Sequence, residues 1–129
     1  MPTGTFRYPE IVAVEAENGT GCDPERPAFC PDFHAAVELI GKRWTGAILW
    51  ALVLRPHYFT ELKKTAPGLS DRLLSCRLRE LEAAGIVERV VHHEEVPARV
   101  SYRLTAKGEQ LTPAMNALQD WAKRWHLAH

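Results

Sequence analysis

The sequence predicts a mainly helical domain that carries a small β-hairpin, an α+β fold, and three features of its 129 residues lead to that expectation. Apolar residues recur at helical spacing in several segments. Over residues 86–105 the period changes to two, as it does in paired strands. A short helix, a Pro-Gly turn and a longer helix come directly before this hairpin. That order of elements is typical of a winged helix-turn-helix.

Two helices are predicted before the Pro-Gly turn, each from the spacing of its apolar residues. Residues 31–40 have helical spacing, with a proline suited to the first turn and a glycine suited to the end. Residues 42–54 follow as a second, more buried helix, with Trp44 in its apolar stripe. The sequence RPHYF at 55–59 predicts a break, because Pro56 cannot lie inside that helix.

Good capping residues mark the next elements. We expect Thr60 to cap a short helix that ends at Pro67-Gly68. Ser70 is a second strong cap and opens the basic helix, about residues 70–84, which Gly85 ends. The hairpin, or wing, takes up residues 86–105.

The C-terminal stretch is helical again. Thr105 caps a segment over residues 106–126, in which Pro113 should kink or restart the helix. Residues 1–29 are rich in Pro, Gly and acidic side chains, and we expect a largely irregular arm there. The winged helix-turn-helix domain then covers residues 30–129.

Charge is distributed unevenly, although the formal net charge is zero. Residues 1–29 hold two basic and five acidic residues, a net of −3, whereas residues 42–79 hold eight basic and two acidic residues, a net of +6. Such a local excess of positive charge is typical of a nucleic-acid-binding surface, although an ordinary solvated face gives the same count.

The helix at 70–84 presents two different faces. At 100° per residue its leucines fall in one sector, which must face the core. Arg72 and Arg79 lie opposite, and neither has an acid on its neighbouring turn at position 76 or 75 respectively. We expect Arg72 and Arg79 to point into DNA, and Arg77, nearer the core edge, to brace the fold or touch phosphate. The residues expected to bind DNA are Lys42, Arg43, Lys63, Lys64, Ser70, Asp71, Arg72, Ser75, Cys76, Arg77, Arg79 and Arg99.

Arg99 belongs to this set as a wing residue. It flanks the hairpin turn, where it would reach the minor groove or a phosphate. Glu94 and Glu95 at the same tip oppose such a contact.

These motifs together resemble the HxlR-type winged helix-turn-helix regulators, relatives of the MarR group. The resemblance runs from Cys30 to Trp125, about three-quarters of the chain, with its motifs in order and at family-like spacing. In place of a basic residue that the family often has near its short strand, this chain has Tyr58. The matching motifs are CP at 30–31, LIGKRWT at 39–45, FTEL at 59–62, PGLS at 67–70, LRELEAAGIVER at 78–89, SYRLTAKGEQL at 101–111 and the Leu118-x-x-Trp121 pair.

The resemblance implies a homodimeric transcription regulator that binds double-stranded operator DNA, and we expect a repressor. It also implies that the terminal helices form much of the dimer. The three cysteines form no even disulfide framework and no close CxxC pair, which fits a reducing cytoplasm. A winged helix used only for protein association is the alternative; it would show no salt-dependent DNA binding. The residues expected at the dimer interface are Phe33, Leu111, Met115, Leu118, Trp121 and Trp125.

Cys30 precedes a proline at the start of the first helix. Helix N-terminal amides stabilise a thiolate at such a position, and some relatives use a cysteine there to sense oxidants or electrophiles. Cys22 is the candidate second thiol. The alternative for Cys30 is a small apolar residue at a helix start. A small aromatic ligand is a further candidate effector.

Other functions have less support from the residues. No nucleophile-base-acid set, Gly-rich phosphate loop or paired-carboxylate motif is present, so we do not expect an enzyme. His92-His93 precede Glu94-Glu95, but no close Cys/His pair repeats as structural zinc sites require, and we expect no metal and no cofactor. No apolar run approaches 18 residues, so no membrane span is expected.

Overall fold

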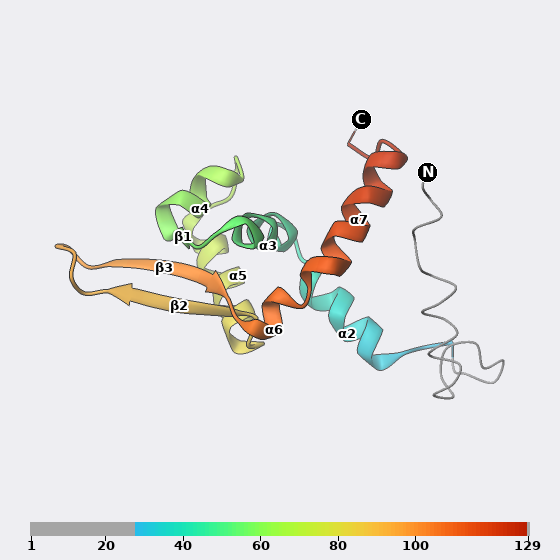
Figure 1. Ribbon diagram of the computed structural model, residues 1–129, viewed down its shortest axis with the longest axis horizontal. Coiled ribbons are helices and arrows are strands. Elements are labelled where there is room, and N and C mark those ends of the chain that lie inside the picture. Colours follow the sequence, from blue (N-terminus) through green and yellow to red (C-terminus); the bar gives the residue numbers. More distant parts are fainter. Residues whose placement is uncertain (1–27, 129) are drawn as a thin grey trace. The chain divides into compact units, whose positions relative to one another are not determined.

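The computed structural model describes residues 28–128. The elements follow in the order α2 (Pro31–Ile40), α3 (Thr45–Leu54), β1 (His57–Tyr58), α4 (Phe59–Thr65), α5 (Asp71–Ala83), β2 (Val87–His92), β3 (Arg99–Leu104), α6 (Ala106–Glu109) and α7 (Thr112–Arg124). Figure 1 shows the long β2–β3 hairpin projecting beside the helices α3, α4 and α5. The winged helix-turn-helix predicted from the sequence is confirmed.

The sheet has one strand more than the predicted hairpin. β1 pairs antiparallel with β3, opposite the side taken by β2, so that His57 faces Tyr102 and Tyr58 faces Ser101. The predicted break at RPHYF is confirmed, because α3 ends at Leu54 and Pro56 lies outside any helix, but the strand β1 within it was not predicted from the residues. Two residues are too short to show an alternating pattern, and their strand conformation comes from pairing with a segment far along the chain.

The second helix begins later than predicted. α3 starts at Thr45, and Trp44 lies before it with a left-handed φ of 73°. This conformation is uncommon for a residue other than glycine, and Trp44 adopts it while its side chain packs against the core. The turn is closed by the Thr45 amide, which donates to the Lys42 carbonyl at 3.0 Å. Lys42 and Arg43 consequently lie in a turn rather than on a helix.

The capping predictions have mixed outcomes. α4 begins at Phe59, so Thr60 is not its cap; the Tyr58 amide donates to the Glu61 side chain at 2.8 Å instead. Strand β1 leads directly into the helix, which leaves no room for a cap at Thr60. Ser70 is confirmed as the cap of α5, because its Oγ accepts from the Leu73 amide at 3.0 Å. Thr105 caps α6 in the same way.

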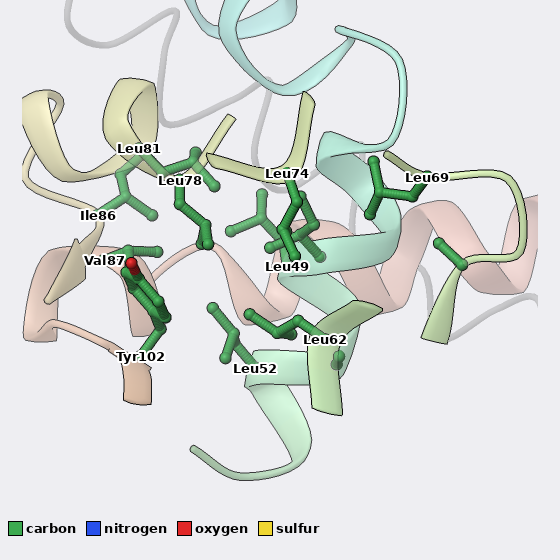
Figure 2. Close-up of a cluster of buried hydrophobic side chains, with 13 residues drawn as sticks. Leu49, Leu52, Leu62, Leu69, Leu74, Leu78, Leu81, Ile86, Val87 and Tyr102 are labelled. Atoms are coloured by element: carbon green, nitrogen blue, oxygen red, sulfur yellow. The ribbon is translucent and has the colours of Figure 1, made fainter. Parts of the chain in front are cut away.

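A leucine row fixes α5 against the rest of the domain. Leu74, Leu78 and Leu81 are at most 1% exposed, as their spacing predicts. Figure 2 shows them pointing into a cluster that includes Leu49 of α3 and Leu62 of α4. Burying one such side chain contributes about 1.5–3 kcal/mol. The orientation of α5 about its own axis is therefore set by the core, and with it the direction of its arginines.

The C-terminal stretch is divided into two helices. α6 ends at Glu109, and α7 restarts at Thr112 with Pro113 in its first turn, as the proline predicts. Among the helices of residues 28–128, none is long and apolar enough to cross a membrane. The predicted arm at 1–29 lies almost wholly outside the described residues, as does Cys22, and the predicted domain boundary stays a prediction.

Candidate nucleic-acid interface

The exposed face of α5 carries two arginines that the fold leaves available. Arg72 and Arg79 are both exposed and stand seven residues apart, about 10 Å along the helix axis. Within residues 28–128 neither forms an ion pair or a hydrogen bond. Ser75 and Cys76 lie half-buried on the helix between them. The face is thus positively charged and flanked by short side chains.

Arg77 has a different environment, as its position near the core edge predicts. Its Nε donates to the Arg43 carbonyl at 2.9 Å, and its guanidinium pairs with Glu80 at 3.3 Å. The side chain is only 16% exposed. Arg77 therefore holds the turn before α3 against α5, and its donors point within the protein.

Glu80 also pairs with Lys42, which lies in the turn before α3. The Lys42 ammonium donates to the Glu80 carboxylate at 3.2 Å, and this hydrogen bond lowers the pKa of Glu80. Lys42 is thereby partly neutralised. Arg43 stays exposed, with its guanidinium 5.5 Å from the ring centre of Trp44.

On α4 the two neighbouring lysines also differ. Lys63 pairs with Asp71 at 2.8 Å and donates to the Leu69 carbonyl at 2.9 Å. This contact ties α4 to the first turn of α5 and compensates the Asp71 charge. Lys64 is exposed, and the part of the chain that the structure describes gives it no ion-pair partner.

The wing contains a cluster that sequence reasoning missed. Arg99 lies with its guanidinium carbon 3.5 Å from the ring centre of Tyr58, and it pairs with Glu95 at 3.7 Å. The Tyr58 hydroxyl donates to Glu95 at 2.9 Å, and this hydrogen bond raises the pKa of Tyr58. The signal available in the sequence was Tyr58 itself, which stands where the resembling family often has a base.

The apolar residues of the C-terminal stretch fall into two groups. Leu111 and Met115 are half-buried and pack against the core of this chain. Leu118, Trp121 and Trp125 are between 52% and 65% exposed. Large apolar side chains exposed together are typical of interaction surfaces. Phe33 on α2 is exposed as well.

Cys30 immediately precedes α2 and is exposed. The amide of Phe33 in the first turn of α2 donates to its sulfur at 3.4 Å. A sulfur in this position occupies the place of a helix cap, where backbone amides favour negative charge.

A helix-turn-helix whose second helix exposes unpaired arginines, followed directly by a wing, defines a class of DNA-binding regulator. The chain belongs to the HxlR-like helix-turn-helix family, whose sequence model matches residues 39–129. It is a transcription regulator of that family and not an enzyme.

Two Bacillus subtilis proteins illustrate the similarity. The chain is 42% identical over 97 residues to the uncharacterized HTH-type transcriptional regulator YvaP. The aligned region covers 75% of this chain and 89% of YvaP. It is also 42% identical over 97 residues to the HTH-type transcriptional regulator YodB, covering 75% of this chain and 86% of YodB.

Solved structures of relatives share the fold. The reduced form of YodB superposes with a TM-score of 0.67 at 42% identity, covering 74% of this chain and 93% of the other. Quinone-bound YodB superposes with a TM-score of 0.65 at 40% identity, covering 74% of this chain and 99% of the YodB chain. The redox regulator HypR in its reduced form superposes with a TM-score of 0.69 at 33% identity, covering 72% of this chain and 91% of the HypR chain.

Proposed function

We propose that this protein is a homodimeric repressor that binds a specific double-stranded operator through α5. The observation that carries the proposal is the contrast among its bases. Lys42, Lys63 and Arg77 are engaged within the domain, whereas Arg72 and Arg79 extend from a helix fixed by its buried leucines. The buried leucines fix the direction in which the two arginines leave the helix, and each planar guanidinium can donate two parallel hydrogen bonds to one acceptor.

The roles along α5 follow from position. The N-terminal turn of a recognition helix meets base edges, so Ser70, Asp71 and Arg72 read sequence. Arg72 is suited to a bidentate contact with guanine, and Arg79, two turns further on, to a second base or a phosphate. Ser75 and Cys76 allow the helix to approach the groove closely.

The surrounding bases contact phosphate and position the protein without reading sequence. Arg43 and Lys64 are exposed and available for this. Lys42 and Lys63 contribute less, because each already neutralises a carboxylate. Arg99 contributes only when it leaves Glu95 and Tyr58.

The dimer forms through the exposed apolar face of α7. Leu118, Trp121 and Trp125 supply the buried centre of a two-fold interface. Phe33 of α2, which is also exposed, is a separate candidate for contact with the partner subunit. Leu111 and Met115 support α7 from the core side. A two-fold dimer presents two copies of α5, which fit half-sites about one helical turn apart.

Regulation acts through Cys30. Its sulfur is exposed and accepts a hydrogen bond from the Phe33 amide at the start of α2. Similar solved structures include diamide-treated and quinone-bound YodB and the redox regulator HypR. Here an oxidant would take two electrons and two protons from two thiols to form a disulfide. A quinone would instead add the sulfur to a ring carbon and keep the thiol proton on its oxygen.

The effector is tested with a Cys30→Ser variant and a Cys76→Ser control. Wild type treated with diamide or benzoquinone should change mobility on non-reducing electrophoresis and lose affinity for its operator. Cys76→Ser should respond in the same way and Cys30→Ser should not. A wild-type protein unchanged in both measurements would refute the sensor. A mobility change that persists in Cys30→Ser would assign the reaction to another thiol. A loss of operator affinity with benzoquinone but without any mobility change would favour a small aromatic ligand bound without a covalent bond.

A further inference from the structure

The tip of the wing brings together three side chains that the proposed function does not use. His92, Glu94 and Glu95 each place one ligand atom so that all lie within 4.8 Å of one another. The sequence offered no repeated Cys/His pair, and for that reason predicted no metal. The hairpin turn supplies the grouping instead, because it folds Glu94 and Glu95 back beside the end of β2.

The distances suit a small divalent ion. His92 Nδ1 lies 3.2 Å from a Glu94 carboxylate oxygen. Two ligands bound at about 2.0–2.1 Å to a tetrahedral ion lie about 3.3 Å apart, so this pair already has the required spacing. The Glu95 carboxylate completes a set of one nitrogen and two oxygens, whose two negative charges balance a divalent cation.

The imidazole of His92 is held in place from its other side. Its Nε2 lies 2.7 Å from the Oγ of Ser101, a buried residue of β3. The ring also packs edge-on against Tyr58, with centroids 5.5 Å apart. Metal-binding histidines are typically oriented by a hydrogen bond at the second ring nitrogen. This arrangement directs Nδ1 toward the two carboxylates.

We propose that His92, Glu94 and Glu95 bind one divalent transition-metal ion of the zinc type, with water completing the coordination. An imidazole ligand favours zinc, cobalt or nickel over magnesium and calcium, which prefer oxygen alone. The neighbouring His93 is exposed and outside the cluster, which makes it a matched control.

Occupying this site changes the neighbourhood of Arg99. Glu95 now accepts from the Tyr58 hydroxyl and pairs with Arg99. When one of its carboxylate oxygens binds the metal, the positive charge of the ion weakens the attraction between Glu95 and Arg99, and Arg99 becomes more available to a DNA phosphate. This consequence rests on the proposed function; metal binding does not.

The site is tested by calorimetric titration of the full chain with Zn²⁺ and Mg²⁺. Because thiolates also bind zinc, all three cysteines are replaced by serine in every sample. We expect one Zn²⁺ per chain and no Mg²⁺ binding. His92→Ala and Glu94→Gln should weaken zinc binding at least about tenfold, while His93→Ala and Glu88→Gln leave it unchanged. Equal zinc affinity in His92→Ala and the parent, or loss of binding in His93→Ala, would overturn the assignment.

The coupling is measured separately, as the affinity for a duplex of mixed sequence with and without Zn²⁺. Zinc should strengthen DNA binding several-fold in the parent and leave Arg99→Ala unaffected. If zinc binds without any change in DNA affinity, the claim that metal binding frees Arg99 for a DNA phosphate is wrong. A protein that binds zinc as expected but no DNA would contradict the proposed function and leave the metal site standing.

Discussion

Removing Arg72 or Arg79 tests the role of α5 most selectively. Neither side chain has an ion pair or hydrogen bond within residues 28–128, and both are exposed. Substitution by alanine therefore removes no contact that holds the described fold together, and the free energy of unfolding should change by no more than about 0.5 kcal/mol.

The effect on DNA binding should be much larger. One bidentate arginine–guanine contact contributes about 1–3 kcal/mol, which corresponds to an affinity loss of roughly 5- to 150-fold. If Arg79 instead meets a phosphate, Arg79→Ala should reduce the slope of log affinity against log salt by about 0.9. The two outcomes distinguish base reading from phosphate contact.

The assay is fluorescence anisotropy with a duplex recovered by in vitro selection, over a series of salt concentrations. Arg124→Ala on α7 is the matched control, since it removes the same charge from an exposed position away from α5. Folded Arg72→Ala and Arg79→Ala variants that bind as tightly as Arg124→Ala would refute the assignment of α5 to DNA.

Three further expectations follow from the contacts. Arg77→Ala should lower the free energy of unfolding by about 1–3 kcal/mol in a denaturant titration, since it loses its bonds to the Arg43 carbonyl and Glu80; stability equal to that of Arg79→Ala would contradict the bracing role. Because the pKa of Glu80 is lowered in the folded protein, its ionised carboxylate stabilises the fold at any pH above the ordinary glutamate pKa of about 4.3. This stabilisation is lost as the pH falls through the lowered pKa of the folded state. The free energy of unfolding of the wild type should thus be larger than that of Glu80→Gln at pH 7, and the two values should become equal in acid. A difference that stays constant with pH would refute the stabilising role of the Glu80 carboxylate. Trp121→Glu should convert the proposed dimer to folded monomers in sedimentation analysis; a dimer that persists in this variant would place the interface elsewhere.

The sequence predicted best what depends on local pattern. The leucine row of α5 follows from periodicity, and Ser70, Gly85 and Pro113 act through backbone chemistry within a few residues. The same row oriented the helix, so the distinction between Arg77 and its neighbours could also be predicted. These features need no knowledge of the rest of the fold.

What the sequence did not predict depends on distant partners. Trp44 takes a left-handed conformation beside the core, and β1 exists because β3 pairs with it. The capture of Arg99 by Tyr58 and Glu95 joins β1 to the hairpin tip, a juxtaposition that only the assembled sheet creates. Counting positive charges likewise overstated Lys42 and Lys63, because their carboxylate partners lie on other elements.

Selection of bound duplexes from a random pool tests the central claim most directly. A dimer that presents two copies of α5 should enrich an inverted repeat whose half-sites lie about one helical turn apart, bound with an affinity that falls steeply as salt increases. A pool that shows no enrichment after repeated rounds, together with no salt-dependent binding of any duplex, would contradict a DNA-binding repressor and favour a winged helix used only for protein association.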